Sequence, residues 1–133
     1  MTSTYIFDAS AIYALIGSKR FALFAEGFTL HLARYELGNI LWKEVHIHKR
    51  MKLEEERMLS EIAEGVFENI EIHDIAGKID AIFHLADKYS ISFYDAAYVY
   101  LAKEKNAILV TDDEKLIKKI KDVINTAQPS GLL

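Results

Sequence analysis

Short runs of apolar, strand-prone residues alternate along this chain with longer segments whose apolar residues recur at helical spacing. The first run covers residues 4–7 and leads into a helix that we expect to end at Gly17 and Ser18. A second strand is expected at residues 28–32, before a helix over residues 33–49. Because strands that alternate with helices pair in parallel, the pattern predicts an α/β fold: a three-layer α/β/α sandwich with a central, mostly parallel sheet.

The second half of the chain continues the alternation. Apolar residues at helical spacing predict a third helix around residues 59–67, a fourth around 75–89 and a fifth over 94–105. Residues 107–110 form a continuous apolar run, which is typical of a parallel strand covered on both faces. We expect a helix over residues 112–121 and a last short strand near Val123 and Ile124.

Length and composition narrow the class of protein. The 133 residues predict a single domain over residues 1–133, and the absence of cysteine excludes thiol catalysis and Cys-ligated metal sites. No segment approaches the roughly 20 consecutive apolar residues of a membrane span, so a cytoplasmic protein without a membrane partner is expected. No Gly-rich run follows a strand, which excludes P-loop and Rossmann nucleotide enzymes. The formal charge of −4 shows no strongly basic footprint for nucleic acid.

Acidic residues follow the predicted strands. Asp8 ends the first strand, and Asp112 and Asp113 follow the run at residues 107–111. Two more acids, Glu36 and Asp95, lie near predicted helix starts inside otherwise apolar sequence. Because parallel α/β folds bind ligands beyond the carboxyl ends of their strands, these side chains are the candidate functional residues.

Each acid also has a purely structural interpretation. Asp8 is a preferred N-cap for the helix that follows it. The segment from Thr111 to Glu114 matches a capping box with Thr111 as the cap, and taken alone that interpretation is the better one for this segment. Asp95 and Glu36 are alternatively first-turn acids that stabilise a helix through its dipole.

Taken together, the acids predict a cation site. Carboxylates brought to one sheet edge repel each other, and a hard cation such as Mg²⁺ or Mn²⁺ allows them to stay ionised. Asn39 and Lys43 follow Glu36 at positions i+3 and i+7, so an amide and an ammonium group can face the same cleft. Ser10 and Thr111 offer additional hydroxyl groups.

Four short segments in a fixed order carry a resemblance to a known family. They are IFDAS at residues 6–10, ELGN at 36–39, FYDAA at 93–97 and LVTDD at 109–113. On these segments the chain resembles PIN domains over nearly its whole length, and most closely the VapC-type toxin ribonucleases. It departs from their pattern at residues 32–34, where the family usually has a proline and a serine and this chain has Leu-Ala-Arg.

The resemblance implies a metal-dependent endoribonuclease that hydrolyses RNA phosphodiester bonds. It assigns catalytic and metal-binding roles to Asp8, Glu36, Asp95 and Asp113, and places Asp112 at a variable position. It also implies three partners: RNA as substrate, a small antitoxin protein that blocks the acidic cleft, and a second copy of the chain in a homodimer. An acidic cleft that attracts cations is also suited to an antitoxin arginine.

Several other functions compete with this interpretation. A stand-alone PIN nuclease of RNA processing and a non-catalytic PIN-fold interaction module stay open as alternatives. An aspartyl phosphatase is disfavoured because Ser10 stands where its second aspartate belongs, and a receiver domain because no acidic pair precedes the relevant strand. His46 and His48 are two positions apart on a predicted helix, so they point to different faces and are not expected to share a zinc ion.

Two groups of surface residues have two interpretations each. Lysines near residues 49–52 and 115–121 either contact the RNA backbone or only aid solubility. The aromatic residues Trp42, Tyr94, Tyr98 and Tyr100 either stack on bases or belong to the core or to a dimer interface.

Overall fold

A five-stranded sheet runs through the centre of the molecule, in the computed structural model that describes residues 4–132. The strand order is β3-β2-β1-β4-β5, and every neighbouring pair is parallel. The strands are β1 (Tyr5–Phe7), β2 (Gly27–Leu30), β3 (Glu71–His73), β4 (Ile108–Val110) and β5 (Thr126–Ala127).

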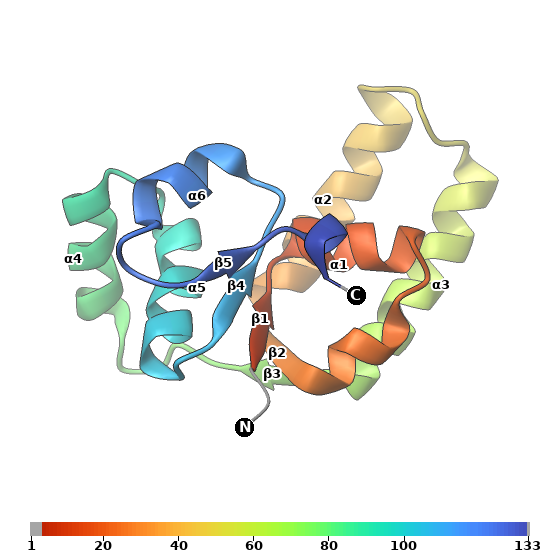
Figure 1. The fold of residues 1–133 in the computed structure, drawn as a ribbon. Coiled ribbons are helices and arrows are strands. Elements are labelled where there is room, and N and C mark those ends of the chain that lie inside the picture. The colour runs from red at the N-terminus through yellow and green to blue at the C-terminus, as the bar shows by residue number, and fades with distance from the viewer. Residues whose placement is uncertain (1–3, 133) are drawn as a thin grey trace.

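Helices cover both faces of this sheet (Figure 1). One side carries α1 (Ala9–Gly17), α2 (Leu32–His46) and α3 (Leu53–Asn69), and the other carries α4 (Ile79–Tyr89), α5 (Phe93–Glu104) and α6 (Glu114–Ile120). Short 3₁₀ helices lie at Phe21–Glu26 and Pro129–Gly131. The predicted three-layer α/β/α sandwich is therefore confirmed. Within residues 4–132, no helix is long and apolar enough to cross a membrane.

The sheet separates two apolar clusters, and its strands contribute to both because successive side chains point to opposite faces. On β1, Ile6 packs with the cluster under α4, α5 and α6, whereas Phe7 packs with the cluster under α1, α2 and α3. Leu109 and Val110 divide in the same way on β4. This double coverage explains why the central strands read as continuous apolar runs.

Gly27 allows β1 and β2 to pair closely at the start of β2. A Cβ atom placed there would lie 2.0 Å from the carbonyl oxygen of Tyr5, its partner in the strand pairing. That carbonyl belongs to the backbone of the central strand and cannot move aside cheaply. Only glycine fits this position without displacing a strand.

Three expectations about the elements were wrong in detail. Strand β3 was not predicted, because it is a three-residue edge strand with Glu71 exposed and only Ile72 carrying an aliphatic side chain. The last strand lies at Thr126–Ala127, since Val123 and Ile124 form the turn after α6, where both amides donate to the carbonyl of Ile120.

The third concerns the end of α2, which stops at His46 and not at residue 49. The chain reverses there because Lys49 adopts a left-handed backbone conformation with φ of 53°. Arg50 then closes the loop by donating to Glu44, through its backbone amide and through two side-chain nitrogens.

Candidate active site

The four carboxylates that the sequence singled out line one cavity of about 250 Å³. Asp8 follows β1 directly, Asp113 follows β4 after two residues, and Glu36 and Asp95 project from α2 and α5. Ser10 and Asn39 lie in the same lining, together with Ala9, Ile40 and Tyr98. The structure thus brings together residues separated by more than a hundred positions, as convergence of the strand ends predicts.

Asp8 both caps α1 and lines the cavity. Its Oδ1 accepts a hydrogen bond of 2.9 Å from the amide of Ala11 and one of 2.7 Å from the hydroxyl of Ser10. The N-cap interpretation of Asp8 is therefore confirmed, but it does not replace the functional one. Capping fixes the carboxylate at the rim of the sheet, where it faces the other acids.

The capping box expected after β4, with Thr111 as the cap, is wrong. The N-cap of α6 is Asp113, not Thr111, and its Oδ1 accepts from the amide of Leu116 at 3.0 Å. Thr111 is fully buried, and its hydroxyl accepts from the amide of Asp113 at 3.1 Å. The Asp112 side chain is exposed and outside the cavity, while its amide donates to the Ser10 hydroxyl at 3.1 Å. Thr111 therefore supports the site through its hydroxyl group, and Asp112 supports it through its backbone amide.

Asp95 and Glu36 occupy different positions within their helices. Asp95 lies in the first turn of α5, where its amide donates to the N-cap hydroxyl of Ser92, as the first-turn interpretation expects. Glu36 is not a first-turn acid, because α2 begins at Leu32 and its first turn holds no acidic residue. Tertiary contact, and not the helix dipole, accounts for the position of Glu36.

Tyr98 is a lining residue that the sequence did not single out for the acidic site, since base stacking and a place in the core or a dimer interface were its two interpretations. It is 2% exposed, and its hydroxyl donates a hydrogen bond of 2.8 Å to Oε1 of Glu36. The expected core location is confirmed for its ring, which packs in the cluster under α4, α5 and α6. Its position three residues after Asp95, on the same helix face, is the sequence signal that could have placed it at the site.

Lys43 does not reach the cavity. Its side chain is exposed on α2, two turns beyond Glu36, whereas the cavity wall on that helix ends at Asn39 and Ile40. Of the lining residues within positions 4–132, none is lysine or arginine. The charge of the carboxylates is therefore not balanced by a basic side chain in the wall.

Burial and mutual repulsion disfavour the ionised forms of three of these acids. Burial raises the pKa of Asp8 above its usual value, although hydrogen bonds from Thr111, Ser10 and the Ala11 amide oppose the rise. Burial raises the pKa of Glu36 as well, and the hydrogen bond from Tyr98 opposes it, while the charges of Asp8 and Asp95 add to it. The pKa of Asp95 is raised by burial first and by the charge of Asp113 second.

These features suit a hard divalent cation. Oxygen donors without sulfur or imidazole, in a wall of uncompensated negative charge, are the chemistry that Mg²⁺ and Mn²⁺ prefer. Among residues 4–132, however, no three His, Cys, Asp or Glu side chains are placed to hold one ion together. An ion here would be held by one or two carboxylates, with water completing its coordination, as is usual for Mg²⁺.

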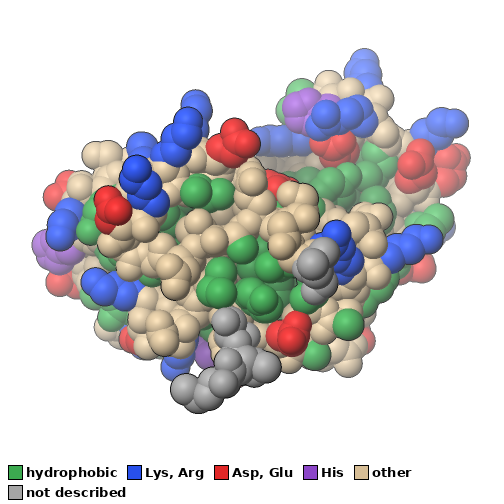
Figure 2. All heavy atoms as spheres, viewed as in Figure 1, with side chains coloured by type: hydrophobic (Ala, Val, Ile, Leu, Met, Phe, Trp, Pro, Cys, Tyr) green, Lys and Arg blue, Asp and Glu red, His purple; other side chains and the backbone are tan. Residues whose placement is uncertain are grey.

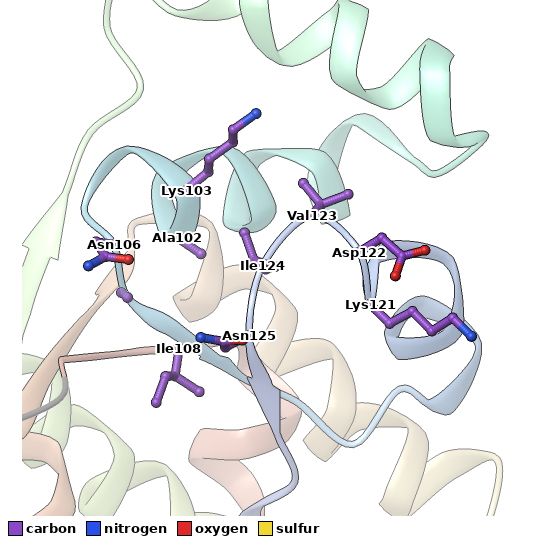
Figure 3. Close-up of a pocket in the computed structure, with 10 residues that line it drawn as sticks. Ala102, Lys103, Asn106, Ile108, Lys121, Asp122, Val123, Ile124 and Asn125 are labelled. Carbon is purple, nitrogen blue, oxygen red and sulfur yellow. The ribbon is translucent and has the colours of Figure 1, made fainter.

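A second cavity, shown in Figure 3, lies at the opposite edge of the sheet. It has a volume of about 230 Å³ and is bordered by the residues that precede β4 and β5, among them Asn106 and Asn125. It contains none of the four acids. On the face drawn in Figure 2, Lys and Arg side chains are spread around the periphery and do not form a single patch.

Comparison with known proteins agrees with this fold. The family model of the PIN domain matches residues 5–122, and the chain belongs to the PIN-domain family. Within that family its curated relatives are VapC-type proteins of Pyrobaculum aerophilum. Exonuclease VapC9 is 33% identical over 94% of this chain and 92% of its own length, and Ribonuclease VapC3 is 36% identical over 86% and 92%.

Solved structures show the same fold. The crystal structure of PAE2754 from Pyrobaculum aerophilum superposes with a TM-score of 0.80 and 30% identity, covering 98% of this chain and 93% of that one. A toxin-antitoxin complex from Klebsiella pneumoniae gives a TM-score of 0.63 at 15% identity, covering 97% of this chain and 100% of that one. At that identity the likeness concerns the fold alone.

Proposed function

We propose that this protein is a divalent-metal-dependent ribonuclease that hydrolyses RNA phosphodiester bonds. The observation that carries the proposal is the lining of one cavity by Asp8, Glu36, Asp95 and Asp113 without a compensating lysine or arginine. The two VapC relatives are named as a ribonuclease and an exonuclease, which supports a nuclease function for this protein. No serine, histidine or cysteine nucleophile is needed for such a reaction.

The four carboxylates would take two kinds of part in the proposed reaction. Asp8, held by its cap hydrogen bonds, and Asp95, in the first turn of α5, orient the metal ion directly or through water. Asp113 lines the same cavity and would hold the ion in the same way. Glu36 is aligned by Tyr98 and either shares the ion or positions the attacking water. When bound, the ion activates the water and offsets the negative charge that develops on the phosphate and the leaving oxygen.

RNA cleavage tests this proposal directly. The purified protein is incubated with a labelled RNA of mixed sequence in Mg²⁺, in Mn²⁺ and in EDTA. We expect cleavage with either ion and none in EDTA. Asp8→Asn should abolish cleavage, because asparagine keeps the N-cap but removes the charge. Asp112→Asn is the matched control, since that side chain lies outside the cavity; full activity of Asp8→Asn would refute the proposal.

The finer part of the proposal is that the protein is an endonuclease, which cleaves bonds inside an RNA molecule. An endonuclease cuts a circular RNA, whereas an exonuclease requires a free end. We expect the circular form of a given RNA to be opened at a rate comparable with cleavage of its linear form. Cleavage confined to the linear RNA would identify an exonuclease.

We also propose that the protein is the toxin of a toxin–antitoxin pair. The support is the VapC names of its relatives and the acidic cavity, which suits an arginine of a small inhibitory protein. Inhibition should then weaken as Mg²⁺ or Mn²⁺ rises, because the ion and the arginine compete. Glu36→Gln and Asp113→Asn should loosen the complex more than changes at Lys118 or Lys119; equal binding by all variants would contradict this mode of inhibition.

We also propose that the protein forms a homodimer, because apolar side chains are exposed on its surface. Large apolar side chains are exposed on α2 and α3, including Trp42 at 53%, Leu53 at 65% and Met58 at 60%. A self-complementary apolar patch is the usual basis of a two-fold interface. Sedimentation should give a species of twice the 15.2 kDa chain mass, and a monomer at high concentration would rule the dimer out.

A further inference from the structure

A third cavity, of about 200 Å³, lies on the same edge of the sheet as the acidic site. It is formed where β2 and β3 end and where α5 begins. We call it the ring-lined cavity, because four of its side chains carry flat rings. The lining residues used below are His31, His73, Asp74, Phe93, Tyr94 and Ala97.

The ring-lined cavity and the acidic cavity share two helices. On α5, Tyr94 belongs to the first and its neighbour Asp95 to the second, and the same holds for Ala97 and Tyr98. On α2, Leu32 lines the first cavity, and Glu36, one helical turn later, lines the second. The two cavities therefore adjoin along α5 and α2, so a polymer with a phosphate at the acids can place a neighbouring group at the rings.

The polar groups of this cavity are held in place before any ligand binds. The imidazole of His73 stacks on Phe28, with ring centroids 4.1 Å apart, and its Nε2 pairs with Glu71 at 2.8 Å. Oδ1 of Asp74 accepts from the amides of Ile75 and Ala76, which fixes that carboxylate. Tyr94, by contrast, is 60% exposed, so its ring is accessible to a ligand.

We propose that the ring-lined cavity binds one nucleobase of the RNA substrate, beside the phosphate that is cleaved; the inference rests on the proposed ribonuclease activity. Aromatic side chains stack on every base, which suits a cavity lined by four rings. The volume is below the roughly 300–1,000 Å³ of pockets that enclose a drug-sized ligand, so it suits a single flat ring system and not a whole nucleotide. Tyr94 then acts as the outer stacking face.

Substitution of Tyr94 tests the proposal. Tyr94→Ala should raise KM for a short RNA by roughly 5- to 100-fold, the range for losing one base–aromatic stack, with a smaller effect on kcat. Tyr94→Phe keeps the ring and should restore KM to within about twofold of the parent protein's. The matched control is Tyr35→Ala, because Tyr35 is 80% exposed on α2 and lines neither cavity.

A second measurement identifies the base. Binding of a short RNA in Mg²⁺ is measured in an Asp8→Asn background, and the base is removed from one nucleotide at a time. At one position, base removal should weaken binding to the Tyr94-containing protein and have no further effect on the Tyr94→Ala variant. Equal weakening in both proteins at every position would overturn the proposal.

The remaining outcomes separate this inference from the proposed function. If the parent protein cleaves RNA and Tyr94→Ala cleaves it with the same KM and the same cut sites, the nucleobase assignment is wrong and the activity stands. If Tyr94→Ala keeps its RNA kinetics but loses affinity for an inhibitory protein, the cavity docks protein instead. If the parent protein cleaves no RNA, the proposed function fails, and the nucleobase assignment fails with it.

Discussion

The hydroxyl of Tyr98 donates a 2.8 Å hydrogen bond to Oε1 of Glu36, joining α5 to α2 across 62 positions of the chain. Glu36 is half-buried, and this bond is the contact that opposes the rise in its pKa caused by burial. The pKa of Tyr98 is itself raised, by burial first and then by the charge of Glu36, so the hydroxyl stays a donor at neutral pH. The pair holds one carboxylate ionised and oriented at the edge of the acidic cavity.

Tyr98→Phe should therefore impair the ribonuclease activity in a pH-dependent way. Loss of the donor raises the pKa of Glu36 further, so the acidic limb of the kcat/KM profile should move to higher pH. We expect an activity loss of about tenfold near neutral pH and a stability cost of about 1.5–3 kcal/mol, the range for a hydrogen bond to a charged group. Tyr100→Phe, on the same helix but outside the acidic cavity, should leave the pH profile in place; an unshifted profile in Tyr98→Phe would contradict the role.

Asp95→Asn should make the metal-free protein more stable at neutral pH. The pKa of Asp95 is higher in the folded state than its ordinary 3.8, so its ionised form destabilises the fold at pH 7.5. That cost disappears as the pH falls toward 3.8, where the carboxyl is protonated in the folded state and increasingly so in the unfolded state. In EDTA we expect the melting temperature to rise by about 2–4 °C at pH 7.5, with a smaller gain at pH 4.

Asp112→Asn is the control for that measurement, because its side chain is exposed outside the cavity. It should change the melting temperature little at either pH. A destabilised Asp95→Asn in EDTA at pH 7.5 would show that the carboxylates do not repel each other in the folded protein.

Mg²⁺ or Mn²⁺ should raise the melting temperature of the parent protein. An ion at a hundred times its dissociation constant stabilises the folded state by about 2.7 kcal/mol if it binds that state alone. Asp113→Asn keeps an N-cap for α6 but removes a charge from the cavity, so the shift should shrink or vanish. Asp112→Asn, one residue earlier, should keep the full shift; equal shifts in both variants would place the ion elsewhere.

Gly27→Ala should destabilise the protein by more than about 3 kcal/mol, because the added methyl group would meet the Tyr5 carbonyl in the central strand. Gly65→Ala is the opposite case. It lies inside α3 with no atom within 4 Å of the added Cβ, and it should gain about 0.5–1 kcal/mol. Urea unfolding of the two variants measures both effects, and a tolerated alanine at position 27 would contradict the strand pairing described here.

Local pattern was sufficient for the helices and for the three central strands. The run at residues 107–110 is apolar at every position because β4 is covered on both faces. It could therefore be identified as a strand without knowledge of the strands that pair with it. The same holds for Asp8 and Asp113, whose location follows from their place directly after a strand. Strand β3 could not be predicted, because three residues at a sheet edge carry almost no periodic signal and pair only when β2 is already in place.

At the site, Asp8 and Asp113 could be placed from the sequence, since the carboxyl ends of parallel strands share one edge, whereas Glu36 and Asp95 reach that edge through the packing of α2 and α5. The neighbours of these acids followed from tertiary packing. The hydroxyl of Tyr98 reaches Glu36, whereas Lys43 does not reach the cavity, although both residues lie at helical spacing from a site acid. The choice depends on how α2 and α5 pack across the sheet. The ring-lined cavity has the same origin, because β2, β3 and α5 form it together and no single segment of the chain contains its pattern.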